Sequence, residues 1–495
     1  MSDTKTIIET IAAGGYEAVI GLEVHVELNT KSKMFCDSAV SFGEPPNTHV
    51  CPVCLGLPGT LPVINKKAVE YTALIGLAVD CRIAGFTQFH RKNYFYPDMP
   101  KNYQISQYDR PICAEGRVGV EMDDYTREVA ITRVHLEEDT GKLIHVGKGG
   151  RIAEADYSLV DFNRAGTPLA EIVTEPDIRT PEEAKVFAQK LRGILLDLGV
   201  SDCNMEEGSM RCDANVSLRR RGATELGTKT EVKNMNSFRA LARALEYEID
   251  RQWQLVQSGE RVKQETRHWD ASRNLTTSLR SKEEAHDYRY FADPDLVPIE
   301  LDPDWVTGLK AGLPELPDAR EARLAAAFGL SAYDARFMAQ SKAHGAYFEA
   351  VMAGFDDAKT AGNWIMGELS AYLNETNRDI AESPVAPEDL AGMLTLVKEG
   401  AISGKMAKDV FKEMYETGRP AAEIVEAKGL KQISGAGEVA KLVDEAIANN
   451  PKAVEEYKAG KQQALGFLVG KVMALSRGQA NPALVNDVLR QKLES

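Results

Sequence analysis

The stretch Leu22-Glu23-Val24-His25-Val26-Glu27-Leu28 alternates apolar and ionisable side chains with a period of two. This period predicts a β-strand with Glu23, His25 and Glu27 on one face and aliphatic side chains on the other. The aliphatic face can enter a core, and the opposite face is then a row of two carboxylates and one imidazole. Oxygen ligands with one nitrogen suit a hard cation such as Mg²⁺ or Mn²⁺, although a solvated polar face produces the same pattern.

The size and charge of the chain narrow its class. At 495 residues we expect about three domains of roughly 150 residues each. The formal net charge of −15 argues against broad, non-specific binding of nucleic acid. No apolar run reaches membrane-spanning length, and residues 1–15 resemble neither a signal peptide nor a transit peptide. We therefore expect a cytoplasmic protein without membrane contact, in which residues 1–15 form a flexible N-terminus.

The texture of the sequence changes along its length. Residues 16–295 read as mixed α/β, and Thr180-Pro181-Glu182-Glu183 is a clear helix start with a cap and a first-turn proline. A stretch rich in proline and aspartate follows near 293–320, and the remainder of the sequence has helical periodicity. We expect an α+β protein with a mixed-sheet domain over 16–295, an all-α domain over 296–415 and a small all-α tail over 416–495.

Two further acidic runs accompany the predicted strand. His135-Leu136-Glu137-Glu138-Asp139 closes a strand, and three adjacent acids repel each other unless a cation or a basic group offsets their charge. Asp161–Glu171 leaves another strand; there Arg164 can hold a phosphate bidentately and Glu171 can supply a metal oxygen. Polar turns are the alternative interpretation of both runs.

A basic and aromatic stretch points to a nucleotide. Arg91-Lys92-Asn93-Tyr94-Phe95-Tyr96 combines cations with tyrosines, which suits a phosphate and stacking on a base or sugar; an ordinary aromatic-rich loop is the alternative. The sequence contains neither a Gly-x-x-x-x-Gly-Lys-Ser/Thr loop nor a Gly-x-Gly-x-x-Gly fingerprint. Acids, cations and histidine spread over several strand ends favour a metal-assisted phosphate site on an uncommon fold.

At these residues the chain resembles GatB, the B subunit of the tRNA-dependent amidotransferases GatCAB. The resemblance spans about residues 15–495 and is carried by motifs in the family's order. These are the stretches 19–28, Cys51-Pro52-Val53-Cys54-Leu55-Gly56-Leu57-Pro58-Gly59, 91–98, 159–169, Met205-Glu206-Glu207-Gly208-Ser209-Met210-Arg211-Cys212-Asp213-Ala214-Asn215 and Gly478-Gln479-Ala480-Asn481-Pro482.

The resemblance implies an activity. The N-terminal "cradle" domain would use ATP and Mg²⁺ to phosphorylate the side-chain carboxylate of Glu-tRNA(Gln) or Asp-tRNA(Asn). Ammonia released from glutamine by the amidase subunit, GatA, would displace the phosphate and give Gln-tRNA(Gln) or Asn-tRNA(Asn), while the small subunit, GatC, clamps GatA to GatB. The helical domain and a YqeY-like tail would hold the tRNA. The lack of an inserted synthetase-like domain and of a transit segment favours the bacterial type.

The resemblance also implies site residues. The family's metal-binding and catalytic positions fall on Glu23, His25, Glu138 and Glu171. Four residues are expected to contact ATP phosphates: Arg91, Lys92, Tyr94 and Arg164.

Zinc is where the chain departs from part of the family. Many members carry a Cys-x-Cys before Cys-Pro-x-Cys, but here Ser38 replaces the second cysteine of that pair, and Cys36, Cys51 and Cys54 remain. Structural zinc prefers four ligands, so we expect a loop held by packing, with bound Zn²⁺ as the alternative.

Two competing hypotheses come from other classes of function. The chain could be a tRNA-binding scaffold with a vestigial ATP site, which the complete set of acids argues against. It could also be a stand-alone ligase acting on a free amino acid, for which the helical tail is unnecessary.

Overall fold

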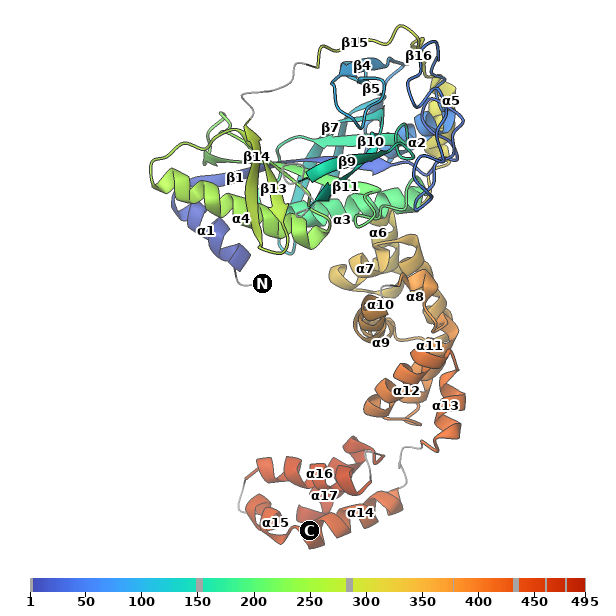
Figure 1. Ribbon diagram of the computed structural model, residues 1–495. Helices are drawn as coiled ribbons and strands as arrows, with labels where there is room; N and C mark the ends of the chain where they lie inside the picture. The colour runs from blue at the N-terminus through green and yellow to red at the C-terminus, as the bar shows by residue number, and fades with distance from the viewer. Residues whose placement is uncertain are drawn as a thin grey trace. The chain divides into compact units, whose positions relative to one another are not determined.

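The computed structural model describes residues 3–147, 155–281, 288–376, 378–430, 436–458, 461–476 and 479–494 (Figure 1). The chain divides into two compact units, Met1–Leu316 and Pro317–Ser495. The first unit combines a mixed sheet with helices and the second is helical, which confirms the expected α+β class. Among the described residues, no helix has both the length and the apolar character needed to cross a bilayer.

A large sheet organises the first unit. Within the described residues it has nine strands in the order β14-β13-β12-β11-β1-β10-β7-β6-β2. The β12–β13 pair is parallel and the other pairs are antiparallel, so the sheet is mixed as expected. Its strands are β1 Tyr16–Glu27, β2 Arg82–Ile83, β6 Cys113–Glu121, β7 Thr126–Glu138, β10 Pro168–Thr174, β11 Met210–Arg220, β12 Thr230–Lys233, β13 Glu265–Asp270 and β14 Leu275–Ser281.

The period-two pattern of residues 22–28 forms the centre of this sheet. Strand β1 lies between β10 and β11, and Leu22, Val24 and Val26 are fully buried in the core. Helices pack on this apolar side: α1 Asp3–Ala13, α2 Lys66–Ala78, α3 Pro181–Leu198 and α4 Phe238–Gln257 (Figure 1). Helix α3 begins where predicted, because Thr180 accepts a hydrogen bond from the Glu183 N–H and Pro181 occupies the first turn.

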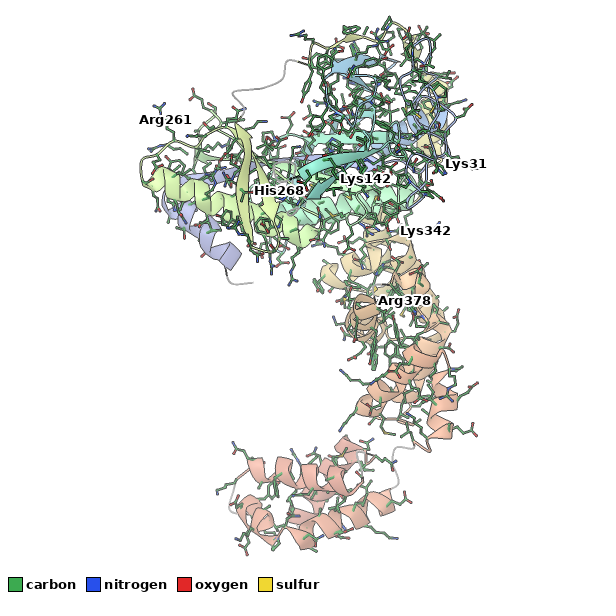
Figure 2. The ribbon with its side chains drawn as sticks, in the orientation of Figure 1. Lys31, Lys142, Arg261, His268, Lys342 and Arg378 are labelled. Atoms are coloured by element: carbon green, nitrogen blue, oxygen red, sulfur yellow. The ribbon has the colours of Figure 1, made fainter. Side chains whose placement is uncertain are left out.

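Smaller sheets border the large one. Strands β15 (Phe291–Ala292), β4 (His90–Asn93) and β5 (Tyr103–Ser106) form one of them, although β15 follows β4 by about 200 residues. Strand β16 (Ile299–Glu300) pairs with β3 (Phe86–Thr87). The hairpin of β8 (Lys142–Gly147) and β9 (Ala155–Asp161) is separate from these, and Lys142 at its start is labelled in Figure 2.

The described residues of the second unit form two apolar cores. One includes Leu324, Phe348 and Phe411, and the other begins at Val439. Its helical elements are α6 Pro317–Phe328, α7 Ala332–Ala339, α8 Lys342–Gly354, α9 Ala358–Trp364, the π-helix Ile365–Leu369, α10 Ser370–Thr376, the 3₁₀-helix Ile380–Glu382, α11 Pro387–Lys398, α12 Gly404–Thr417, α13 Ala421–Ala427, α14 Ala436–Asn449, α15 Pro451–Lys458, α16 Gln463–Leu475 and α17 Pro482–Glu494. Gly478 of the C-terminal motif lies outside the described residues.

The N-terminal segment differs from the sequence prediction. Where residues 1–15 were expected to be flexible, Asp3–Ala13 forms helix α1, and Ile11 is 1% exposed in the core. Ile7, Ile8 and Ile11 recur at helical spacing and give the segment an apolar stripe to bury. Met1 and Ser2 lie outside the described residues.

The predicted domain boundaries also shift. Residues 296–316 belong to the first unit, because helix α5 (Pro303–Ala311) packs on its core through Trp305 and Leu309. Residues 293–316, most of the proline-rich stretch, are therefore a structured margin of the sheet domain. Helix α13 contributes Ala421 and Ile424 to the first core of the second unit, so the tail core begins after residue 430 rather than at 416.

Candidate active site

Charged side chains line the face of the large sheet opposite the helices. In the register of the sheet, His25 on β1 lies opposite Glu171 on β10, and Glu171 lies opposite His135 on β7. Glu23 lies one side-chain pair further along β1, opposite Asp213 on β11. Adjacent strands bring directly opposed side chains to about 5 Å, so the pairing alone assembles this group from separate segments.

Glu171 is the centre of the cluster. Its Oε2 lies 3.3 Å from His25 Nε2 and 3.5 Å from His135 Nε2. His25 Nε2 is also 3.6 Å from a Glu23 oxygen, and His135 Nε2 is 3.8 Å from a Glu137 oxygen. Two overlapping sets of donor atoms therefore meet at Glu171, each within 4.8 Å: Glu23, His25 and Glu171, and His135, Glu137 and Glu171.

Charges of both signs meet in the cluster. Burial alone would lower the pKa of His25, but the hydrogen bond and charge of Glu171 raise that pKa to about 9. Burial would raise the pKa of Glu171, yet His135 and His25 hold it well below its usual range. The His25 imidazolium thus offsets one carboxylate charge, and a divalent cation, which binds the neutral imidazole, would offset two.

The donor set fits a divalent cation. The three carboxylates supply the oxygen ligands that Mg²⁺ and Mn²⁺ prefer, and His25 offers one nitrogen beside them. Arg133 donates from Nε to His135 Nδ1 at 3.3 Å, which leaves His135 Nε2 directed at the carboxylates. Because Nδ1 accepts this hydrogen bond, Nε2 carries the ring proton and donates toward the carboxylates, so His135 acts here as a hydrogen-bond donor rather than as a metal ligand.

Lys92 is the phosphate-binding candidate that the structure brings to the cluster. Burial would lower the pKa of Lys92, but the carboxylates of Glu137 and Glu171 raise it. Its Nζ lies 5.2 Å from the centre of the Tyr288 ring. Lys92 therefore remains a cation beside the carboxylates, where it can attract an anionic substrate.

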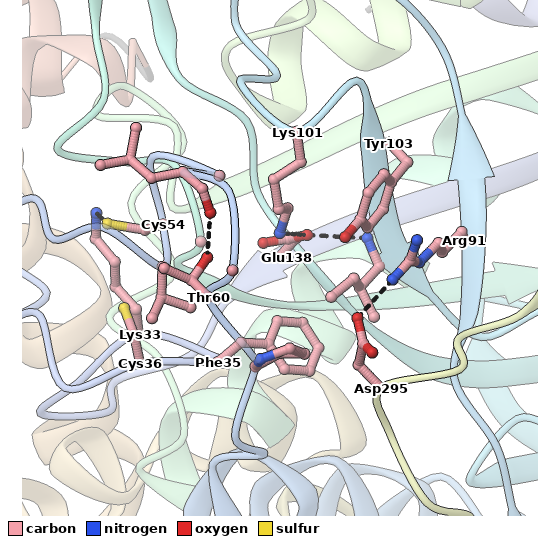
Figure 3. A pocket seen from close by; sticks show the side chains of 17 residues that line it. Lys33, Phe35, Cys36, Cys54, Thr60, Arg91, Lys101, Tyr103, Glu138 and Asp295 are labelled. Carbon is pink, nitrogen blue, oxygen red and sulfur yellow. Dashed lines mark hydrogen bonds and ion pairs between the residues drawn. The ribbon is translucent and has the colours of Figure 1, made fainter.

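The structure does not bring Glu138 to this cluster. Its Oε1 accepts hydrogen bonds from Lys101 Nζ and, at 2.9 Å, from the Ile105 N–H. Glu138 instead lines a pocket of about 260 Å³ together with Lys101, Tyr103 and Cys54 (Figure 3). The family-based assignment of Glu138 as a metal ligand thus differs from the geometry, which places the preceding residue, Glu137, at the cluster. Side chains alternate along a strand, so neighbouring acids at 137 and 138 project to different sides of it.

Arg91 is committed to other partners. Its Nε donates to Asp293 at 2.9 Å and its Nη2 to Asp295 at 2.8 Å, which ties β4 to the segment that follows β15. Its guanidinium also lies 4.2 Å from the centre of the Tyr103 ring, and it lines the pocket of Figure 3.

Arg164 and Tyr94 are held differently again. Arg164 donates to the carbonyl oxygens of Thr140 and Gly141 at 3.0 and 3.1 Å, so it fixes the turn after β7. Tyr94 is partly buried, and burial followed by the charge of Asp98 raises the pKa of its hydroxyl. These contacts assign Arg164 a positioning role in the loop.

Sequence reasoning left Arg133, His135 and Glu137 without assigned roles. His135 and Glu137 belong to the acidic run of residues 135–139, and their period-two spacing within a strand is the available signal. Arg133 extends the same period by one step, which places it on the face of His135. The pairing of β7 with β10 then decides which acid of the run meets Glu171.

The three cysteines gather as the sequence suggested. The sulfur atoms of Cys36, Cys51 and Cys54 lie within 4.8 Å of one another. Cys54 Sγ accepts from the Cys51 N–H at 3.1 Å and from Lys33 Nζ at 3.6 Å, and a hydrogen bond from Cys36 lowers the pKa of Cys54 to about 4. The lysine already balances one thiolate, and three sulfur ligands are one fewer than structural zinc prefers.

A polar sheet face that gathers carboxylates, imidazoles and a half-buried lysine is suited to an enzyme that handles phosphate with a metal. Comparison with known proteins makes this class specific. Residues 18–307 match the GatB/GatE catalytic domain and residues 346–493 match the GatB domain of the GatB_Yqey family.

Curated relatives extend over nearly the whole chain. The chain is 57% identical over 479 residues to the B subunit of an aspartyl/glutamyl-tRNA(Asn/Gln) amidotransferase from Moorella thermoacetica, covering 97% of this chain and 100% of the relative. It is 55% identical over 478 residues to the protein of that name from Carboxydothermus hydrogenoformans, covering 97% and 99%. The chain therefore belongs to the family of aspartyl/glutamyl-tRNA(Asn/Gln) amidotransferase B subunits.

Proposed function

We propose that this chain is the catalytic B subunit of a glutamine-hydrolysing amidotransferase that converts Glu-tRNA(Gln) to Gln-tRNA(Gln), Asp-tRNA(Asn) to Asn-tRNA(Asn), or both. The observation that carries the proposal is the cluster centred on Glu171, where His25 and His135 approach the same carboxylate oxygen. This cluster lies within the stretch that matches the GatB/GatE catalytic domain. ATP is the phosphoryl donor, and the protein works in the cytoplasm.

The reaction joins two anions in its first step. An oxygen of the substrate carboxylate attacks the γ-phosphorus of ATP, the bond to the β,γ-bridging oxygen breaks, and ADP leaves. Lys92 offsets part of the negative charge, and Arg133 holds His135 in the required orientation. Bound Mg²⁺, held by Glu171 together with Glu23 and His25 or with Glu137, would neutralise charge that develops on the phosphoryl oxygens.

The second step uses ammonia. Its nitrogen attacks the acyl carbon of the phosphorylated substrate, phosphate leaves, and a proton is released. The amidase GatA supplies the ammonia and the small protein GatC joins GatA to this chain, so the working enzyme is a heterotrimer. The helices of residues 317–495 bind the tRNA.

The testing experiment measures ATP hydrolysis by the chain purified together with GatA and GatC. We expect Mg²⁺-dependent hydrolysis that Glu-tRNA(Gln) or Asp-tRNA(Asn) stimulates and that EDTA abolishes. The stimulating tRNA identifies the substrate. An intact heterotrimer that neither mischarged tRNA stimulates would contradict the proposal and favour a scaffold with a vestigial site.

A further inference from the structure

A pair of stacked tyrosines lies beside the cluster. The rings of Tyr108 and Tyr290 are 4.3 Å apart between centroids and nearly parallel, at 11°. Tyr108 is 59% exposed, although an aromatic ring of this size would normally gain from burial. One face of the Tyr108 ring is covered by Tyr290, and the exposed remainder can accept another flat ring.

The partner ring is fixed by the chain around it. Tyr290 precedes β15, whose Phe291 pairs with Arg91 on β4. The Asn93 N–H donates to the Tyr288 carbonyl oxygen at 3.0 Å, on the other side of Tyr290. Contacts on both sides therefore hold Tyr290 in place, and Tyr108 rests on a supported ring rather than on a free loop.

An acidic side chain adjoins the exposed ring. Asp109 follows Tyr108, its side chain is 60% exposed, and its Oδ1 lies 3.2 Å from His90 Nε2. His90 is buried, and its ring packs edge-on against Tyr108 at 6.3 Å. His90 thus orients the Asp109 carboxylate beside the tyrosine ring. Its second oxygen lies 4.0 Å from Arg110 Nε at the surface, and lone pairs on the carboxylate remain for a ligand.

Short contacts connect these residues to the catalytic cluster. Ser106, two residues before Tyr108, donates its hydroxyl to a Glu137 oxygen at 3.0 Å. Two residues span at most about 7 Å of chain, so the exposed ring is within one nucleotide length of the carboxylates. Tyr290 lies 6.1 Å from the Tyr288 ring, and Lys92 Nζ lies 5.2 Å from that same ring. The path from Tyr108 to the cluster therefore passes a cation.

We propose that Tyr108 and Asp109 bind the adenosine of ATP, with the base stacked on Tyr108 and the ribose hydroxyls donating to Asp109. The triphosphate then extends past Lys92 toward the cluster. This inference rests on the proposed function, which requires ATP. Stacking on an aromatic ring tolerates any base, and a carboxylate that accepts from the ribose hydroxyls is a common way to hold a nucleotide.

The 3′-terminal adenosine of the charged tRNA offers the same base. Its ribose, however, carries the amino acid on one of its two hydroxyls, whereas ATP has both hydroxyls free. A single carboxylate can accept hydrogen bonds from two adjacent hydroxyls. Asp109 therefore favours ATP over the tRNA terminus as the occupant.

The test uses the heterotrimer and measures binding of ADP and of 2′,3′-dideoxy-ADP by calorimetry with Mg²⁺. We expect Tyr108→Ala to weaken ADP binding about tenfold and Tyr108→Phe to change it less than about twofold. The wild type should prefer ADP over dideoxy-ADP about tenfold, and Asp109→Ala should abolish that preference. Tyr333→Ala, at a 69% exposed tyrosine of helix α7, is the matched control and should leave ADP affinity unchanged.

Each contrary result is distinct. Unchanged ADP affinity in Tyr108→Ala with a raised KM for the charged tRNA would overturn the assignment to ATP and give the ring to the tRNA terminus. Unchanged values for both ligands would overturn the site altogether. A wild-type heterotrimer that binds no ADP would instead refute the ATP use in the proposed function. Because both side chains are exposed, the variants should fold, and circular dichroism confirms this.

Discussion

Glu137 and Glu138 are neighbours on β7, yet their carboxylates belong to different sites. A Glu137 oxygen lies 3.8 Å from His135 Nε2 in the cluster centred on Glu171. Glu138 forms an ion pair with Lys101 and lines the pocket of Figure 3. The two acids therefore have separable roles, which substitution can distinguish.

We expect Glu137→Gln to weaken binding of the metal and Glu138→Gln to spare it. Loss of a charged ligand should lower Mn²⁺ affinity at least about tenfold, because the amide offers only one neutral oxygen. Titration of the heterotrimer with Mn²⁺, followed by electron paramagnetic resonance, measures both variants. If Glu138→Gln loses the metal and Glu137→Gln retains it, the family-based assignment of Glu138 is correct and the cluster described here is not the metal site.

The Arg164→Lys variant tests whether Arg164 positions the loop after β7 or contacts the phosphates of ATP. A lysine cannot donate to the carbonyl oxygens of Thr140 and Gly141 in the two-pronged way that the guanidinium does. We expect the free energy of unfolding of the first unit to fall by about 1–3 kcal/mol, while the KM for ATP changes less than about twofold. Urea unfolding and steady-state kinetics give the two values. A tenfold rise in the KM for ATP with unchanged stability would show that Arg164 contacts phosphate.

The sequence predicted the features that depend on local periodicity and capping, namely a strand face and a helix start. Alternation over residues 22–28 placed Glu23 and His25 on one strand face, and capping residues located the start of helix α3 at Pro181. Both depend on neighbours within a few residues, where backbone geometry alone determines which side chains share a face.

The sequence did not predict which distant segments pair with each other. Arg91 forms ion pairs with Asp293 and Asp295, which lie about 200 residues away in the sequence. The phosphate role expected for Arg91 did not take these two ion pairs into account. Likewise, the choice between Glu137 and Glu138 depends on how β7 pairs with β10, and a shift of one residue would exchange their sides.

A zinc chelator should have little effect on the thermal stability of the loop that carries Cys36, Cys51 and Cys54. Lys33 and backbone donors already stabilise the Cys54 thiolate, so we expect a chelator selective for Zn²⁺ to change the melting temperature by less than about 1 °C. Differential scanning calorimetry of the heterotrimer, with and without the chelator, measures this. Co-purification of one zinc per chain, lost together with several degrees of melting temperature, would show instead that the three cysteines form a structural zinc site.

Glu248→Gln should destabilise the first unit in a pH-dependent way. Glu248 is fully buried on α4 and accepts hydrogen bonds from Thr230 at 2.7 Å and from Arg251 at 2.6 Å. Burial would raise its pKa, but Arg251 holds the pKa below the usual value of 4.5. Because the folded pKa is depressed, the stabilisation is present above pH 4.5 and is lost as the pH falls through the folded pKa. Breaking a buried ion pair costs about 3–5 kcal/mol at neutral pH.

Urea unfolding at pH 7 and at the lowest pH where the fold persists tests this. The gap between wild type and Glu248→Gln should narrow in acid, because the protonated carboxyl of the wild type is then neutral like the amide. Glu128→Gln, at an exposed acid of β7, is the control and should shift the free energy of unfolding by less than about 0.5 kcal/mol at both pH values. A gap that stays constant down to the lowest pH would mean that the hydrogen bonds, rather than the charge of Glu248, hold α4 against the sheet.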